Sequence, residues 1–139
     1  MSVDSAGMAA RLGIKPGMVV QELGWDEDAD EDLRDAIVDL SGGEMVDEDT
    51  DEVADVVLMW WREDDGDLVD ALMDAIGALA DDGVVWLLVP KSGRPGHVEP
   101  GDVTEVAPTA GLSQTSSISA AKDWSGIRLV TPKTDRTRR

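Results

Sequence analysis

The sequence has no cysteine, tyrosine or phenylalanine, and it has a single histidine, His97. The absence of cysteine excludes disulfides, thiolate catalysis and cysteine-ligated zinc or iron–sulfur clusters. One histidine cannot build a histidine-rich metal site, and we expect neither a metal nor a cofactor. No run of about 18 uncharged apolar residues is present, and the first residues lack the basic start and apolar centre of a secretory signal. We therefore expect a cytoplasmic protein without a membrane attachment.

Positive charge is also scarce. Twelve Lys and Arg residues stand against 30 Asp and Glu, which gives a formal net charge of −18. This excess repels phosphate backbones and anionic lipids, so it argues against direct binding of nucleic acid or membranes by the folded domain. A basic protein is the electrostatically natural partner, and an equally good explanation is that the acids keep the protein soluble.

The 139 residues, 42% of them hydrophobic, are enough for one core and too few for two. We expect one domain over residues 1–132. The tail over residues 133–139 is polar and basic without apolar anchors, and we expect it to be disordered.

Apolar runs and spacings predict the main elements. Buried strands are expected over 18–23, 54–61 and 84–89, with the second of these at the centre of a sheet. Apolar residues three and four apart predict amphipathic helices over 30–40 and 67–79, the second stopped by Asp81, Asp82 and Gly83.

Shorter elements complete the expected order. They are a helix over 6–12 capped by Ser5, a strand over 44–46, a helix over 100–110 weakened by Pro108, and strands over 112–120 and 127–131. Turn chemistry at 123–126 joins the last two strands into a hairpin. The alternation predicts an α/β fold with three layers, namely a mostly parallel, Rossmann-like sheet with helices on both faces that ends in an antiparallel hairpin.

Three segments carry a resemblance to a known family. They are LGIKPGMVVQELGW at 12–25, DGVVWLLVPKSG at 82–93 and AGLSQTSSISAAKDWSGIRLV at 110–130. In this order they resemble the small family, common in actinobacteria, that is known as domain of unknown function 3052. The resemblance covers nearly the whole chain and implies no established activity.

The layout is also similar to a trimmed, degenerate class I methyltransferase fold, in which the first strand ends in an acid and a glycine-rich turn. Glu22 and Gly24 match the start of that cofactor motif, and the resemblance implies cofactor binding by Glu22, Gly24 and Trp25. Where such enzymes continue with glycines that approach S-adenosylmethionine, this chain has Trp25 followed by the acids at 26–28. Gly24 thus either belongs to a retained S-adenosylmethionine site or only turns the chain.

Familiar catalytic and metal-binding motifs are missing. Asp26, Asp28 and Asp30 alternate as in a calcium loop, but Glu31 and Ile37 occupy the sixth and twelfth positions, where glycine and glutamate are required. No GxSxG turn supplies a serine nucleophile. With 30 acids, no pair of carboxylates stands out for acid–base work, and we name no catalytic residue.

Two further groups are candidates for binding. Lys91, Arg94 and His97 lie in a loop after a strand, where open α/β sheets place ligand sites, and suit an anion or a carboxylate; the alternative is a loop that is merely polar. Five tryptophans lie at positions 25, 60, 61, 86 and 124. Trp60 and Trp61 point to opposite faces of a strand, Trp86 belongs to the core, and Trp25 and Trp124 lie in turns, as packing residues or as surface anchors.

The leading hypothesis is a non-catalytic interaction or regulatory protein that docks a basic protein partner. Fifteen of the 30 acids lie between Asp26 and Asp55, where Arg34 is the only base. The residues expected to bind this partner are Asp26, Glu27, Asp28, Asp30, Glu31, Asp47, Glu48, Asp49 and Trp124. The alternative is a small-molecule binder or enzyme, with a ligand such as S-adenosylmethionine or a nucleotide in the cleft near Gly24, Trp25, Glu63 and Lys91.

Overall fold

The sheet in the computed structural model begins with three parallel strands. The structure describes residue 7 and residues 10–47, 52–77 and 79–131. Strand β1 (Val20–Leu23) pairs with β2 (Ala54–Trp60), and β2 pairs with β3 (Leu79–Pro90), both in parallel. The apolar run of β2 is buried because both faces of the sheet are covered.

The last two strands close the sheet as an antiparallel hairpin. Strand β5 (Trp124–Val130) lies between β3 and β4 (Ser113–Ser119) and runs antiparallel to both, so the order in the described sheet is β1-β2-β3-β5-β4. The predicted α/β fold with a mostly parallel sheet is confirmed. The middle strand is β3 rather than β2, which corrects the expected centre.

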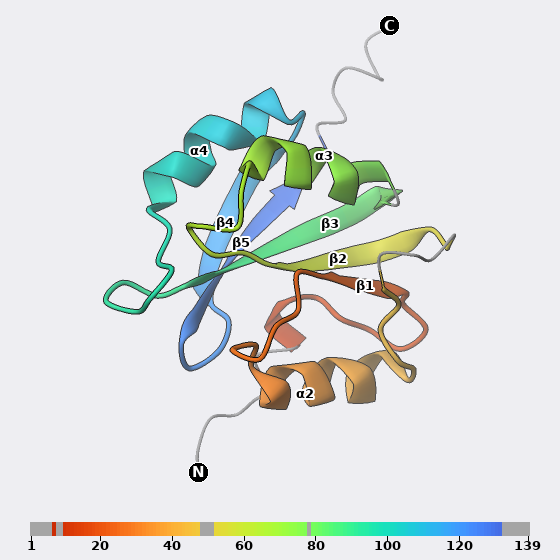
Figure 1. Cartoon of the computed structure of the whole chain (residues 1–139). Helices are drawn as coiled ribbons and strands as arrows, with labels where there is room; N and C mark the ends of the chain where they lie inside the picture. The colour runs from red at the N-terminus through yellow and green to blue at the C-terminus, as the bar shows by residue number, and fades with distance from the viewer. Residues whose placement is uncertain (1–6, 8–9, 48–51, 78, 132–139) are drawn as a thin grey trace, which may run out of the picture.

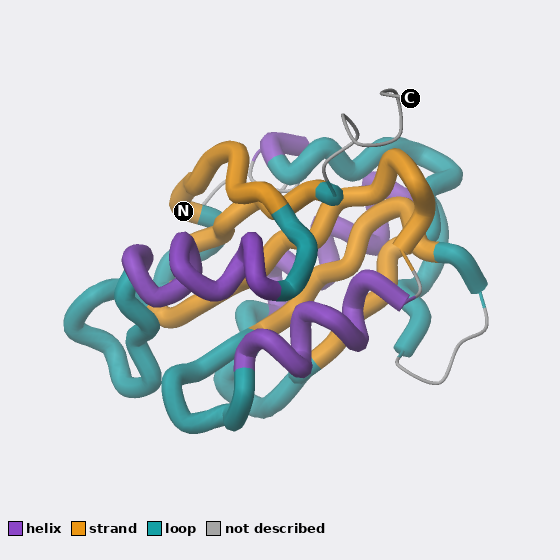
Figure 2. Tube along the Cα trace, turned by 90° about the horizontal axis from the view of Figure 1, so that it is seen from above, coloured by secondary structure: helices purple, strands orange, loops and turns teal. Residues whose placement is uncertain are grey.

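Helices cover both faces of this sheet and make three layers (Figure 1). Helix α2 (Glu31–Ser41) lies on one face, and α3 (Leu68–Gly77) and α4 (Pro100–Thr109) lie together on the other. The view from above shows helices lying over the strands of the sheet (Figure 2). Leu33 and Ile37 of α2 pack with Trp60 and Trp86, whereas Leu72 of α3 packs with the opposite face.

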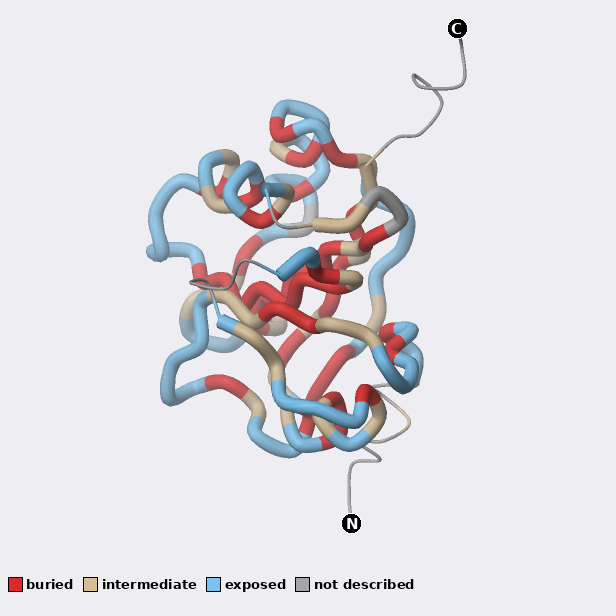
Figure 3. The backbone as a smooth tube through the Cα atoms, turned by 90° about the vertical axis from the view of Figure 1, so that its right-hand side faces the viewer, coloured by how far each residue is buried: buried red, intermediate tan, exposed pale blue. Residues whose placement is uncertain are grey.

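The buried residues concentrate in the strands, and the loops around them are exposed (Figure 3). Trp60 and Trp61 pack into the cores on opposite faces of the sheet, and Trp86 is 2% exposed, as the sequence predicted. No helix in the described ranges is long and apolar enough to cross a membrane.

Several predicted boundaries were wrong. Helix α3 ends at Gly77 and β3 begins at Leu79, so Asp81–Gly83 lie within the strand; a register shift against β2 between Ala54 and Val56 accommodates the extra residues. Trp124, Ser125 and Gly126 belong to β5 instead of a turn, because they pair with Pro90, Val89 and Leu88.

The expected strand over 44–46 is reduced to one bridge between Gln21 and Val46. The Ser5 cap, residues 48–51 and the tail over 133–139 lie outside the described residues.

Candidate functional site

The direction of the chain reverses beside β1, and this reversal fixes the position of the candidate site. From β1 the chain passes through α2 to Val46, whose backbone bonds to Val20 and Glu22 on the side of β1 away from β2. It then returns to β2 and passes through α3, on the other face, to β3. In doubly wound sheets, such a switch point opens a crevice beyond the carboxyl ends of the strands, where ligands bind.

A pocket of about 530 Å³ lies at this place. Its walls come from the end of β1 and the following turn (23–26), from the end of β2 and the following residues (59–62), from Asp65, and from Ala71 and Asp74 of α3. Trp25 is half exposed at its edge. The pocket combines indole and thioether surface with three carboxylates, those of Asp26, Asp65 and Asp74.

Gly24 is required by the packing of β1 against β2. Its φ is +75°, and a Cβ at this position would lie 2.3 Å from the carbonyl oxygen of Trp60. No side chain fits into that space, so both the backbone conformation and the close approach demand glycine. The turn after β1 therefore has a structural reason that is independent of any ligand.

Glu22 is engaged inside the protein. Its carboxylate accepts hydrogen bonds from Nε (2.5 Å) and Nη2 (2.7 Å) of Arg34 and from the indole Nε1 of Trp60 (2.9 Å), and its side chain is 9% exposed. These bonds raise the pKa of Arg34, because they stabilise its charged form. Glu22 is not among the residues that line the pocket, and its contact with a cofactor stays a prediction.

Arg62 supplies the cation of the site, and sequence reasoning missed it. Its guanidinium donates to both carboxylate oxygens of Asp28, to the carbonyl oxygens of Gly24 (2.6 Å) and Trp60 (3.2 Å), and to Asp65 (3.4 Å). It also stacks over the ring of Trp124, 5.2 Å from the centroid. A single base just after a buried strand was the signal that could have revealed it.

The charges around Arg62 compensate one another. Burial alone would lower the pKa of Arg62, but hydrogen bonds and attraction from Asp28 and Asp65 raise it overall. The same bond to Arg62 lowers the pKa of Asp28. Asp26 and Asp74 remain as carboxylates on the pocket wall without that cation, so the pocket favours positive charge.

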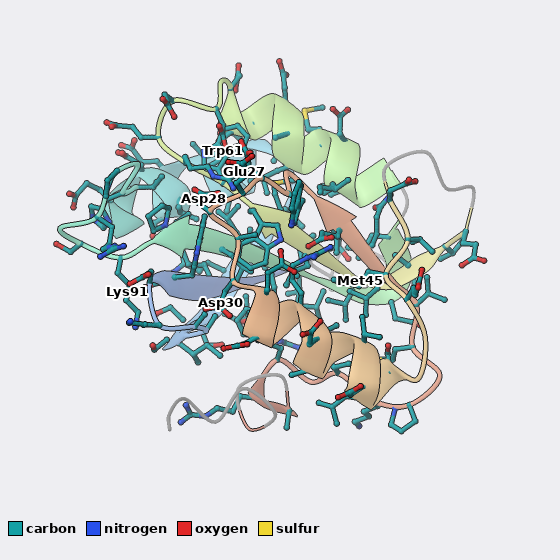
Figure 4. All side chains as sticks on the ribbon, turned by 60° about the horizontal axis from the view of Figure 1, so that its bottom comes forward. Glu27, Asp28, Asp30, Met45, Trp61 and Lys91 are labelled. Atoms are coloured by element: carbon teal, nitrogen blue, oxygen red, sulfur yellow. The ribbon has the colours of Figure 1, made fainter. Side chains whose placement is uncertain are left out.

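Three of the acids expected to face a partner also make contacts within the protein, and two of them, Asp28 and Glu31, keep more than half of their side chains exposed. Asp30 caps α2 by accepting from the backbone N–H of Leu33 (2.9 Å), and Asp28 holds Arg62. Glu31 accepts from the Trp25 indole (3.1 Å) and from Arg34 (2.7 Å), and these bonds lower its pKa. Figure 4 shows Asp28, Glu27 and Trp61 toward the same end of the sheet, with Asp30 at the start of α2.

The remaining predicted partner residues fall into three groups. Asp26, Glu27 and Asp47 are exposed, and Glu48 and Asp49 lie outside the described residues. Trp124 is 3% exposed; its ring packs edge-on against Trp60 with centroids 4.9 Å apart, and its Nε1 donates to the Asp28 carbonyl. The structure places it in the core rather than at the surface.

The loop after β3 separates its three basic residues. Arg94 pairs with Asp123 at the surface (3.3 Å), and Lys91 donates to the Ser119 hydroxyl (2.6 Å). His97 bonds through Nδ1 to the Pro90 carbonyl (2.8 Å). None of them lines the switch-point pocket, nor does Glu63, whose backbone N–H bonds to Gly96. In the part of the chain that the structure describes, no group of three or more His, Asp or Glu residues is arranged to hold a metal.

Residues 9–133 match the family described as "Protein of unknown function (DUF3052)". The chain belongs to this family. It is 59% identical over 129 residues to the uncharacterized proteins Mb2263c of Mycobacterium bovis and Rv2239c of Mycobacterium tuberculosis, with 93% of this chain and 81% of each relative covered. The expected family is confirmed.

Solved structures similar to this DUF3052 protein include S-adenosylmethionine-dependent methyltransferases. One from Aquifex aeolicus is similar at a TM-score of 0.63 and 14% identity, over 91% of this chain and 88% of that one. The glycopeptide N-methyltransferase MtfA in complex with sinefungin is similar at a TM-score of 0.61 and 13% identity, over 93% of each chain. At these identities the likeness shows the fold, and it confirms the methyltransferase-like layout.

Proposed function

We propose that this DUF3052 protein binds a small organic cation of the S-adenosylmethionine class in the switch-point pocket. The observation that carries the proposal is the pocket itself, which lies where doubly wound sheets bind ligands and is walled by Trp25 and carboxylates. The proposal concerns binding, and we assign no catalytic residue.

Charge supports a cation over a nucleotide. The Arg62 guanidinium is already neutralised by Asp28 and Asp65, so it offers no free charge to a phosphate. Asp26 and Asp74 add negative charge to the wall. A sulfonium or an amine gains from these carboxylates, whereas a triphosphate is repelled.

The indole of Trp25 supports a ligand with a flat group. Its ring is half exposed, and it is held by Glu31 through Nε1 and by Arg34 at 5.6 Å from the ring centroid. A fixed indole beside a pocket offers stacking to a purine and a cation–π contact to a sulfonium.

Calorimetric titration with S-adenosylmethionine, S-adenosylhomocysteine and ATP tests this proposal. We expect binding to decrease in that order, because the three ligands carry a sulfonium, a neutral thioether and a triphosphate. A ligand present at 100 times its Kd should stabilise the fold by about 2.7 kcal/mol.

A matched pair of variants on α3 locates the binding. Asp74→Asn removes a pocket carboxylate and should weaken S-adenosylmethionine binding by up to about fivefold, the range of an exposed charge pair. Asp70→Asn removes an exposed acid of the same helix that does not line the pocket, and should change little. Absence of binding by any of the three ligands would overturn the proposal, and equal effects of the two variants would refute the location.

Docking of a basic protein by the acidic face is a second candidate function. It is favoured by one observation on α2, where Asp32, Asp35 and Asp39 are all exposed along the helix. With the exposed Asp26 and Glu27 they form an acidic surface. Such a surface attracts a basic partner in a salt-dependent way.

Affinity purification of the tagged protein from its native cells tests the second candidate. We expect one basic partner at low salt that is lost at high salt, and lost at low salt from the variant in which Asp32, Asp35 and Asp39 are all Asn. A partner that resists salt, or that still binds this variant, would contradict docking by the acidic surface.

A further inference from the structure

A second pocket lies on the other side of the loop that follows β3. It has a volume of about 290 Å³ and is formed between that loop and the β4–β5 hairpin. Val89, Val98 and Ile127 give it buried apolar walls, while His97 and the hydroxyls of Ser119 and Ser125 add polar groups. It shares no lining residue with the switch-point pocket.

The polar groups of this second pocket have hydrogen-bond donors to offer. An ammonium group only donates, so Ser119 Oγ must accept from Lys91 Nζ, and its own O–H remains available to a ligand. Gln114 accepts at Oε1 from the Thr104 hydroxyl (2.9 Å), which leaves its amide N–H groups to donate. Donors at Ser119 and Gln114 suit a ligand group that accepts hydrogen bonds.

The charge of the surrounding chain differs from that of the rest of the protein. Residues 84–131 contain four Lys or Arg and four Asp or Glu, so their formal charges cancel. Residues 1–83, by contrast, contain 25 acids and four bases. The Lys91 side chain projects from the end of the sheet, apart from the acidic group around Asp28 (Figure 4). An anion therefore meets less repulsion at the second pocket than at the first.

We propose that the second pocket binds a short-chain organic carboxylate. The carboxylate accepts hydrogen bonds from Ser119, whose hydroxyl is polarised by Lys91, and from Gln114. Its hydrocarbon chain lies against Val89, Val98 and Ile127. One cation and apolar walls fit a monoanion with a carbon chain better than they fit a phosphate, which needs several cationic donors.

Glu99 adjusts the affinity. The Pro90 carbonyl fixes Nδ1 of His97 as a donor, and Nε2 faces the Glu99 carboxylate at 3.4 Å. The Glu99 side chain is 73% exposed and carries the same sign of charge as the ligand. Its negative charge opposes binding of the carboxylate, so a variant without this charge should bind the ligand more tightly.

Titration with butyrate, followed by ¹H–¹⁵N NMR spectra at low salt, tests the proposal on the whole chain. We expect saturable shifts in the loop after β3 and in the β4–β5 hairpin. Butyramide has the same shape without the charge and inorganic phosphate has charge without the chain; both should bind at least about fivefold more weakly, since each lacks one of the two recognised features.

Variants with a matched control assign the binding to these residues. Lys91→Met and Ser119→Ala should each weaken butyrate binding by about fivefold, and Glu99→Gln should strengthen it. Lys122→Met removes an exposed lysine other than the one that bonds to the pocket residue Ser119, and should leave the affinity unchanged.

Three outcomes would overturn the proposal. They are the absence of saturable shifts with butyrate in the wild-type protein, equal binding of butyramide or phosphate, and equal losses in the Lys91 and Lys122 variants. The comparison of ligands uses the wild-type protein, so it stands even if a variant fails to fold. Binding of acetyl-alanyl-alanine without binding of butyrate would also overturn it, in favour of a peptide carboxyl terminus.

Discussion

At the scale of single residues, the candidate site is held together by hydrogen bonds and ion pairs among neighbouring residues. Glu22 is held by Arg34 and Trp60, and Arg62 is held by Asp28 and by the carbonyl of Gly24. Buried charges of this kind are stable only when paired and hydrogen-bonded. The bonds of Arg62 to Asp28 and to the Gly24 carbonyl therefore hold this part of the pocket wall before any ligand binds, and little reorganisation is required of it.

Gly24→Ala gives the sharpest prediction at this scale. The added Cβ would collide with the Trp60 carbonyl oxygen, in addition to the cost of a positive φ for alanine. We expect a loss in free energy of unfolding of more than about 2 kcal/mol, measured by urea denaturation.

Gly17→Ala is the matched control for this change. Gly17 has a similar φ of +87°, but nothing lies within 4 Å of its added Cβ. Its loss should be about 1 kcal/mol, which is the cost of the backbone conformation alone. Equal losses in the two variants would show that the close approach of β1 to β2 contributes nothing.

At the scale of elements, the sequence predicted what local patterns encode. The apolar run of β2 and the three-and-four spacing in α2 are local properties, and both elements formed as expected. Asp81–Gly83 and Trp124–Gly126 have the composition of turns, yet both segments lie in strands. Trp124–Gly126 pair with β3, and Asp81–Gly83 fall in the stretch of β3 where its register against β2 shifts. The pairs Arg34–Glu22 and Arg62–Asp28 are 12 and 34 residues apart, and no spacing rule reveals such partners.

The start of α2 carries the prediction at the element scale. Asp30→Ala removes the side-chain oxygen that accepts from Leu33 N–H, so we expect the free energy of unfolding to fall by about 1 kcal/mol in thermal or urea denaturation. Asp32→Ala removes an exposed first-turn acid without capping contacts and should cost about 0.3 kcal/mol. A larger loss from Asp32 than from Asp30 would contradict the assignment of the cap.

At the scale of the whole molecule, charged residues that cluster in the sequence have different surroundings in the fold. The sequence showed the acidic segment clearly. The structure adds that Asp28, Asp30 and Glu31 bond within the protein, Asp28 and Glu31 from exposed positions, and that Asp32, Asp35 and Asp39 are exposed along α2. The sequence placed Lys91, Arg94 and His97 in one loop, and the structure directs Arg94 to Asp123 and the other two toward the second pocket. The sequence thus shows which charged residues the chain has, and tertiary contacts decide which of them stay available to a partner or a ligand.

The position of β5 has a consequence for how the sheet is completed. Strands β3 and β4 are joined only through β5, which is the last strand of the described chain to be synthesised. Until Trp124–Val130 have emerged, β3 has an unpaired edge whose apolar residues are otherwise buried, and β4 has no neighbour in the sheet. An open apolar edge invites pairing with other chains, and contacts between distant segments form slowly. The nascent protein is therefore most exposed to aggregation just before its final strand inserts.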